Sequence, residues 1–310
     1  MPLVMDEKIA EIPSQSELGR KVYAEYDPSK KYTWQDFVDY RSSGPTRIEK
    51  YGYRHYVSPF GALPSVTTVL SNTMGNKASL ERWAAKNPGK REEAAARGSA
   101  VHLAMENWLI GVDKNPKFEN EEYAKFWEGM PEVLEKLDNI IWSEGPVGDH
   151  FNWTRGSDNI CRLWHPGVKE GETWGWAGTA DGIGTYKGKT VLFDLKTSNG
   201  PYYQRHPGPD CPKNEYGMRR AGFFKLQKCW TQCAAYAMAA EHTIGIVPEL
   251  MFTIVATVDR VQTFAIQKPT IEKYKQKWLE QVEKFYTEVV PSWQEDEDES
   301  VDVDEDEKNA

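Results

Sequence analysis

Three charged residues lie on two strand-like segments that a short turn joins. The stretch GTADGIGTYKGKTVLFDLKTS, residues 178–198, reads as a hairpin. A period of two places Asp194 and Lys196 on one face of the second strand, and Asp181 would lie on the first strand, close across the hairpin. A buried carboxylate needs a cation. Two carboxylates supply the oxygen ligands of Mg²⁺ or Mn²⁺, which take the rest of their shell from water and a phosphate substrate.

Lys196 would then lie beside the metal ion. Its ammonium group could orient or deprotonate the attacking water and offset charge on a phosphate. The alternative is an ion pair between Asp194 and Lys196 that is satisfied within the sheet and has no catalytic role. The hairpin alone leaves both interpretations open.

Further polar residues fall where they could complete such a site. His102 and Glu106 are four residues apart in a helical segment, so they share one helix face. Glu144 ends the apolar segment IIWSE. Gln232 and Tyr236 share a face of an alanine-rich helix, where small neighbours allow close approach.

Taken in their order along the chain, these polar residues resemble the active-site motifs of the RecB-like branch of the PD-(D/E)xK nuclease superfamily. A second pattern narrows the resemblance to the mitochondrial genome maintenance exonuclease group and its phage-encoded relatives. It consists of the stretch LPSVTTVL at residues 63–70, followed by Leu80, Trp83 and an AARGS segment. The resemblance covers about residues 54–240. The matching elements are RGxxxH with His102, Glu144 at a strand end, GTAD with Asp181, the triplet Asp194-Leu195-Lys196, and QxxxY with Gln232 and Tyr236.

The resemblance implies a metal site and its ligands. Asp181 and Asp194 would bind Mg²⁺, and Mn²⁺ would be able to substitute. The Leu195 carbonyl would complete the protein's share of the shell, and His102 would be a further ligand. Glu144 would support the metal or its water.

The resemblance also implies the chemistry, which is hydrolysis of a phosphodiester that leaves a 5′-phosphate. Lys196 would position the nucleophilic water. Gln232 and Tyr236 would hold the active-site strand or the DNA backbone. Two glycines of the hairpin would let that backbone come close: Gly178 and Gly182.

Several residues are candidate contacts to nucleic acid. Hydroxyl groups in segment 63–70 could bind phosphates, although β-branched residues there are also what a surface strand requires. Residues 200–224 form a longer connection than this family leads us to expect, and they are rich in Tyr, Phe, Arg, His and Pro. We expect a loop that threads a single strand beside the site, or else a structural flap. The candidate contacts are Ser65, Thr67, Thr68, Arg97, Tyr202, Tyr203 and Arg205.

The four cysteines do not favour an iron-sulfur cluster. No CxxC spacing occurs, and no cysteine follows Cys233, where the iron-sulfur relatives keep a cysteine cluster. Cys229 and Cys233 lie four residues apart and could share a metal, but free thiols are the more favoured interpretation.

The net charge of −9 lies entirely in residues 294–310, which contain ten acidic residues and one lysine. The other 293 residues hold 37 acidic and 37 basic side chains. A neutral body can still present a basic groove to DNA. The tail has no apolar periodicity and should be disordered, and it would solvate the protein, compete with DNA or contact a protein partner.

The sequence contains neither a run of about 18 apolar residues nor a signal-peptide pattern. We therefore expect a soluble protein that does not associate with membranes. Its expected location is the cytoplasm, which would be that of a bacterial host if the protein is phage-encoded.

The expected fold is mixed α/β (α+β), with a central mixed β-sheet flanked by helices, a restriction-endonuclease-like core and a helical N-terminal part. Residues 1–53 would form a partly irregular extension with a short helix at 33–40, residues 54–293 a single nuclease domain, and residues 294–310 the tail. Helices are expected at 77–86, 91–110, 121–140 with a break at Pro131, 224–242 and 270–290. Strands are expected at 54–70 in two runs, 140–144, 175–186, 190–196 and, as a hairpin, 249–267.

Together these features predict a Mg²⁺-dependent DNA exonuclease that acts on single-stranded ends in replication, repair or recombination. An endonuclease or a double-strand-processing nuclease of the same fold is the alternative. A non-catalytic DNA-binding or partner-binding protein is less favoured, because a decayed site would not be expected to keep the whole set of polar residues together.

Overall fold

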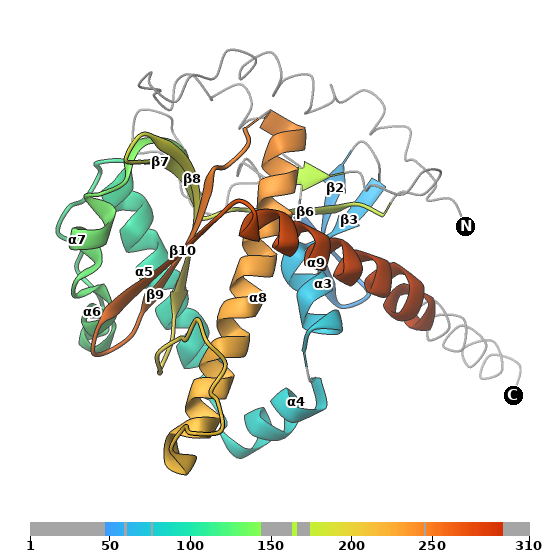
Figure 1. The fold of residues 1–310 in the computed structure, drawn as a ribbon, viewed down its shortest axis with the longest axis horizontal. Helices are drawn as coiled ribbons and strands as arrows, with labels where there is room; N and C mark the ends of the chain where they lie inside the picture. Colours follow the sequence, from blue (N-terminus) through green and yellow to red (C-terminus); the bar gives the residue numbers. More distant parts are fainter. Residues whose placement is uncertain are drawn as a thin grey trace, which may run out of the picture.

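The computed structural model describes residues 47–58, 61–75, 77–143, 163–165, 174–244 and 246–293. These residues form a mixed α/β structure in which helices flank a central sheet (Figure 1), as predicted from the sequence. The helix predicted at 33–40, the candidate residue Glu144 and the acidic tail lie outside the described residues. None of the described helices combines the length and the apolar composition that crossing a bilayer requires.

The central sheet has five strands within the described residues, in the order β10-β9-β8-β7-β4. The middle strand β8 pairs antiparallel with β7 and parallel with β9. Both long edges of β8 are therefore hydrogen-bonded inside the sheet. The strands are β4 (Asp138–Ser143), β7 (Gly182–Tyr186), β8 (Lys189–Thr197), β9 (Leu250–Ala256) and β10 (Val261–Gln267).

Helices cover both faces of this sheet (Figure 1). On one face lie α5 (Lys90–Leu109), α6 (Glu121–Trp127) and α7 (Met130–Leu134). On the other lie α8 (Lys213–Ile244) and α9 (Thr270–Lys284), which continues as the π-helix η4 (Phe285–Val289). The residues of β8 alternate between the two cores. Those in the α5 core are Val191, Phe193 and Leu195, and Leu192 packs in the α8 core.

A small antiparallel sheet precedes the helices. It consists of β1 (Arg47–Lys50), β2 (Tyr53–Ser58) and β3 (Gly61–Pro64), in that order. The predicted boundary between residues 53 and 54 falls inside β2, and β1 lies in the segment that we assigned to the N-terminal extension. Residues 47–50 therefore pair with residues 53–56 of β2.

The second β-branched run of segment 54–70 is a helix, α3 (Val66–Thr73), and the prediction of a strand there was wrong. Ser65 caps the helix, because its hydroxyl accepts a hydrogen bond from the backbone N–H of Thr68 at 2.9 Å. Val66, Val69 and Leu70 recur at helical spacing and are fully buried. Capping and burial therefore outweigh the strand propensity of the β-branched residues.

The run predicted as one strand at 175–186 is two strands. β6 (Trp176–Gly178) pairs with β5 (Leu163–His165) outside the central sheet, and β7 starts only at Gly182. Asp181 therefore lies in the bend just before β7 and not within a strand.

Most helices agree with the sequence pattern. α4 (Lys77–Lys86) has the predicted bounds, and α5 differs from its prediction by one residue at each end. Pro131 divides the predicted helix at 121–140, because α7 begins at Met130 after Gly129, which has a φ of 80°. α8, however, begins 11 residues before the predicted start at residue 224. Its early turns carry an ion pair at i,i+4 between Glu215 and Arg219, at 2.8 Å.

Candidate active site

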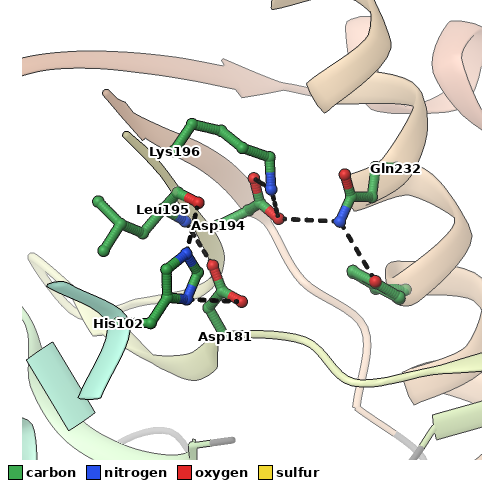
Figure 2. A network of polar contacts seen from close by, with 7 residues as sticks. His102, Asp181, Asp194, Leu195, Lys196 and Gln232 are labelled. Atoms are coloured by element: carbon green, nitrogen blue, oxygen red, sulfur yellow. Dashed lines mark hydrogen bonds and ion pairs between the residues drawn. The ribbon is translucent and has the colours of Figure 1, made fainter. Parts of the chain in front are cut away.

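The polar end of β8 holds a buried ion pair (Figure 2). The side chain of Asp194 is 1% exposed, and the Lys196 ammonium lies 2.7 Å from both of its carboxylate oxygens. Only the contact to Oδ1 has the geometry of a hydrogen bond, so among the described residues Asp194 Oδ2 is buried with an ion-pair contact to Lys196 but no hydrogen bond. A charged pair is therefore present at the middle of the sheet, and one oxygen of it is not fully satisfied.

Two side chains of α8 fix Asp194 from the neighbouring layer. The amide of Gln232 donates from Nε2 to Asp194 Oδ1 at 3.1 Å, and the same nitrogen lies 3.2 Å from the hydroxyl oxygen of Tyr236. Gln232 and Tyr236 share a helix face, as their spacing predicted. Gln232 therefore holds the strand that carries Asp194, and Tyr236 contacts the Gln232 amide.

Asp181 and His102 meet the same strand from its other side (Figure 2). Asp181 Oδ2 accepts a hydrogen bond from the backbone N–H of Leu195 at 2.5 Å. His102 Nε2 lies 3.1 Å from the Leu195 carbonyl oxygen, and its Nδ1 lies 3.6 Å from Asp181 Oδ1. Because a carbonyl oxygen only accepts, Nε2 carries the hydrogen in that contact. The imidazole therefore lies between two of the other candidate metal ligands.

The electrostatics of the pair follow from burial. Burial is the largest cause of a raised pKa at Asp194, the Lys196 ammonium opposes it, and the neighbouring Asp181 carboxylate adds to it; together they give a pKa of about 7. Burial also disfavours the ammonium form of Lys196, but the Asp194 and Asp181 carboxylates outweigh it and raise the pKa of Lys196. Lys196 is therefore an ammonium group at neutral pH, which favours orienting a water over deprotonating it.

The donor atoms fit a hard cation such as Mg²⁺. Asp181, Asp194 and the Leu195 carbonyl offer oxygens, and the buried Oδ2 of Asp194 is an atom that a cation would satisfy. Within the described residues, no three His, Cys, Asp or Glu side chains gather closely enough to hold a metal by themselves. A cation here would depend on the carbonyl oxygen, water and a substrate phosphate, as Mg²⁺ commonly does.

Two residues of the site are partly exposed to solvent. The side chains of Lys196 and His102 are 27% and 22% exposed, whereas those of Asp181 and Asp194 are 7% and 1% exposed. A substrate would therefore meet the lysine and the histidine before the carboxylates. Glu106, four residues after His102, is buried on α5.

The two glycines of the hairpin have a different role from the one expected. A Cβ atom at Gly178 would lie 2.7 Å from the Tyr236 ring, and one at Gly182 would overlap the Phe193 ring. Their small size thus allows buried rings to pack inside the protein, and it is not used to admit a phosphate backbone.

The candidate nucleic-acid contacts before the sheet are mostly buried. Ser65 and Thr68 are 2% and 4% exposed, and the Thr68 hydroxyl donates to the Arg54 carbonyl at 2.9 Å. Of the three hydroxyl residues, Thr67 has an exposed side chain. Arg97 is 7% exposed, and its guanidinium group packs over the Phe126 ring at 4.4 Å. Burial thus leaves Thr67 as the accessible member of this group.

The candidates after β8 are divided between core and surface. Tyr202 is buried, and its backbone N–H and C=O both bond the Gln262 side chain, at 2.9 and 3.2 Å. Tyr203 is half-buried beneath Arg219, whose guanidinium carbon lies 5.2 Å from the ring centroid, and Arg205 is exposed. Since residues 213–224 belong to α8, the expected loop is limited to 198–212.

Sequence reasoning missed three residues of α8 that border the site. Lys225 and Lys228 precede Gln232 by seven and four residues, and this helical spacing was the available signal. Cys229 is buried beside Lys196, and burial raises the pKa of its thiol to about 12. Cys229 is therefore an uncharged neighbour of the ion pair.

No protein-family model and no curated protein matches this chain. Among solved structures, the crystal structure of SSO0001 shares 14% sequence identity with it, and the match covers 58% of this chain and 85% of SSO0001. The TM-score of that match is 0.24, and a similarity at this level shows neither a shared fold nor a shared function.

Proposed function

We propose that the protein is a metal-dependent nuclease that hydrolyses phosphodiester bonds at single-stranded DNA ends and leaves 5′-phosphates. One observation carries the proposal. Asp181, Asp194 and Lys196 converge at the end of a central strand, where Gln232 reaches them from α8 and His102 from α5. Burying charged groups is costly, and ionisable groups whose pKa values burial perturbs are concentrated at functional sites.

Each residue has a role in this proposal. Asp181, Asp194 and the Leu195 carbonyl would hold Mg²⁺, or Mn²⁺ in its place, with His102 as a further ligand. The cation would polarise the scissile phosphate and make water a stronger nucleophile. Lys196 would orient that water and neutralise charge on the phosphate. Gln232 would keep Asp194 in place by holding Oδ1, which leaves Oδ2 for the cation.

A digestion experiment tests this function. End-labelled linear and circular single-stranded DNA is incubated with the protein in Mg²⁺ or in EDTA. We expect loss of the linear substrate in Mg²⁺ alone, with products that a kinase can label only after phosphatase treatment, as a 5′-phosphate requires. Cutting of the circle would instead support the endonuclease alternative. The absence of metal-dependent loss of any substrate would contradict the proposal.

Variants with matched controls test the site. Asp194→Asn and Lys196→Ala should each lower the rate by about 100-fold or more, because the first removes a charged ligand of the cation and the second removes the group that orients the water and neutralises the phosphate. Asp138→Asn and Lys189→Ala make the same changes at exposed positions of the same sheet, and they should keep the wild-type rate. A wild-type rate for Asp194→Asn or Lys196→Ala would show that the site is assigned wrongly.

A further inference from the structure

A row of side chains on the first half of α8 ends at the candidate active site. Lys225, Lys228 and Gln232 recur at steps of three and four residues and therefore share one side of the helix. Gln232 bonds Asp194 directly. With a rise of about 1.5 Å per residue, Lys228 lies about 6 Å and Lys225 about 10 Å before Gln232 along the helix axis.

Neither lysine has an acidic partner in the part of the chain that the structure describes. Within the described residues, no ion pair joins Lys225 or Lys228 to a carboxylate. Lys225 Nζ lies instead 5.8 Å from the centroid of the Tyr202 ring. Burial lowers the pKa of Lys228, and the charge of Lys196 lowers it further, so those two ammonium groups are close enough to repel each other. Cations gathered in this way favour an anion between them.

An exposed aromatic residue lies beside the lysines. Phe224 is 49% exposed and precedes Lys228 by one helical turn. The guanidinium carbon of Arg220 lies 5.3 Å from the centroid of the Phe224 ring, and the ring of His206 lies 5.9 Å from it. Flat, exposed rings next to cations bind single-stranded nucleic acid, because bases stack on the rings while the cations contact phosphates.

We propose that Arg220, Phe224, Lys225 and Lys228 form a track that leads single-stranded nucleic acid into the active site. Lys225 and Lys228 contact backbone phosphates next to the one that is cut, and Phe224, with Arg220 against it, stacks a base. The contacts are to features that every nucleotide shares, so the track binds without sequence preference. This inference rests on the proposed function for the reaction that follows binding.

Binding in EDTA tests the track separately from catalysis. The affinity of the full chain for a labelled single-stranded oligonucleotide is measured over a series of salt concentrations. Lys225→Gln and Lys228→Gln should each weaken binding and reduce the slope of log affinity against log salt by about 0.7, the value for one phosphate contact on a single strand. Phe224→Leu keeps apolar bulk but removes the ring, and it should weaken binding roughly tenfold.

Three controls separate the contacts from general effects. Lys228→Arg and Phe224→Trp should retain binding, and Lys189→Gln, at the far end of β8, should leave it unchanged. Wild-type affinity and salt dependence in both lysine-to-glutamine variants would overturn the track even if the protein digests DNA. Weaker binding by these variants in a protein that digests nothing would support the track and reject the nuclease.

Discussion

At the scale of the residue, burial beside Lys196 is the feature that makes Asp194 a candidate catalytic group. Its carboxylate is fully buried in a strand that also carries Val191, Phe193 and Leu195, and within the described residues Lys196 and Gln232 bind it. The period-two pattern was sufficient to predict that Asp194 and Lys196 share a face. It could not predict that Asp181 would bond the Leu195 N–H, because that contact depends on a bend that the pattern read as a strand.

The raised pKa of Asp194 predicts a pH dependence of stability. In the folded chain the Asp194 carboxyl keeps its proton up to a pH of about 7, whereas in the unfolded chain it loses the proton near pH 3.8. The contribution of Asp194 to the free energy of unfolding is therefore fully present below pH 3.8. It is lost as the pH rises through 7. Relative to Asp194→Asn, the wild type should lose a few kcal/mol of unfolding free energy between these values, at about 1.4 kcal/mol per pKa unit.

Urea unfolding in EDTA at several pH values measures this difference. Asp138→Asn, at an exposed strand position, should follow the wild type throughout. Mg²⁺ should recover stability for the wild type above pH 7 and not for Asp194→Asn, because a cation binds the ionised carboxylate. If the free energy of unfolding changed with pH in the same way for Asp194→Asn and the wild type, the raised pKa of Asp194 would be contradicted.

At the scale of the element, the sequence predicted the central sheet well and its surroundings less well. β8, β9 and β10 have strong apolar or alternating patterns, and each formed where expected. α3 was read as a strand because its β-branched residues were judged locally, without the cap and the core that it packs against. The early start of α8 was missed because Gly217 and Gly222 have low helix propensity.

Gly182 connects the packing of the sheet to the site. A methyl group there would overlap the ring of Phe193, which is fully buried beneath α5. Gly182→Ala should therefore destabilise the protein by about 1–3 kcal/mol and lower activity, since Asp181 is the preceding residue. Urea unfolding should show this loss, while Gly200→Ala, which meets no atom within 4 Å, should change stability little.

A second substitution keeps that prediction testable if the alanine variant folds poorly. Phe193→Leu makes room beside residue 182, so the double variant Gly182→Ala with Phe193→Leu should be more stable than the sum of the two single effects. Simple additivity would show that the ring is not the cause.

At the scale of the whole molecule, charge is distributed unevenly along the chain. Residues 294–310 carry the entire net charge of −9, and the other 293 residues are neutral. The cations of the proposed track on α8 are therefore a local concentration of positive charge and not part of an overall basic protein. These cations act locally, within about 10 Å at moderate salt.

Removal of residues 294–310 should tighten the binding of single-stranded DNA, because the acidic segment then no longer competes for the cations. The difference between the full chain and the shortened chain should shrink as salt increases. Affinity measurements at low and moderate salt check this expectation. Equal affinities for the two proteins would assign the segment to solubility.

The central position of β8 has a consequence for how the molecule fluctuates. Amides of a strand that is hydrogen-bonded on both sides exchange with solvent only through large openings, whereas exposed helix ends open at little cost. Deuterium should therefore enter the first turns of α8 long before it enters residues 192–196. The first turns of α8, which precede the proposed track, can open and re-form many times while the carboxylates of Asp181 and Asp194 keep their positions.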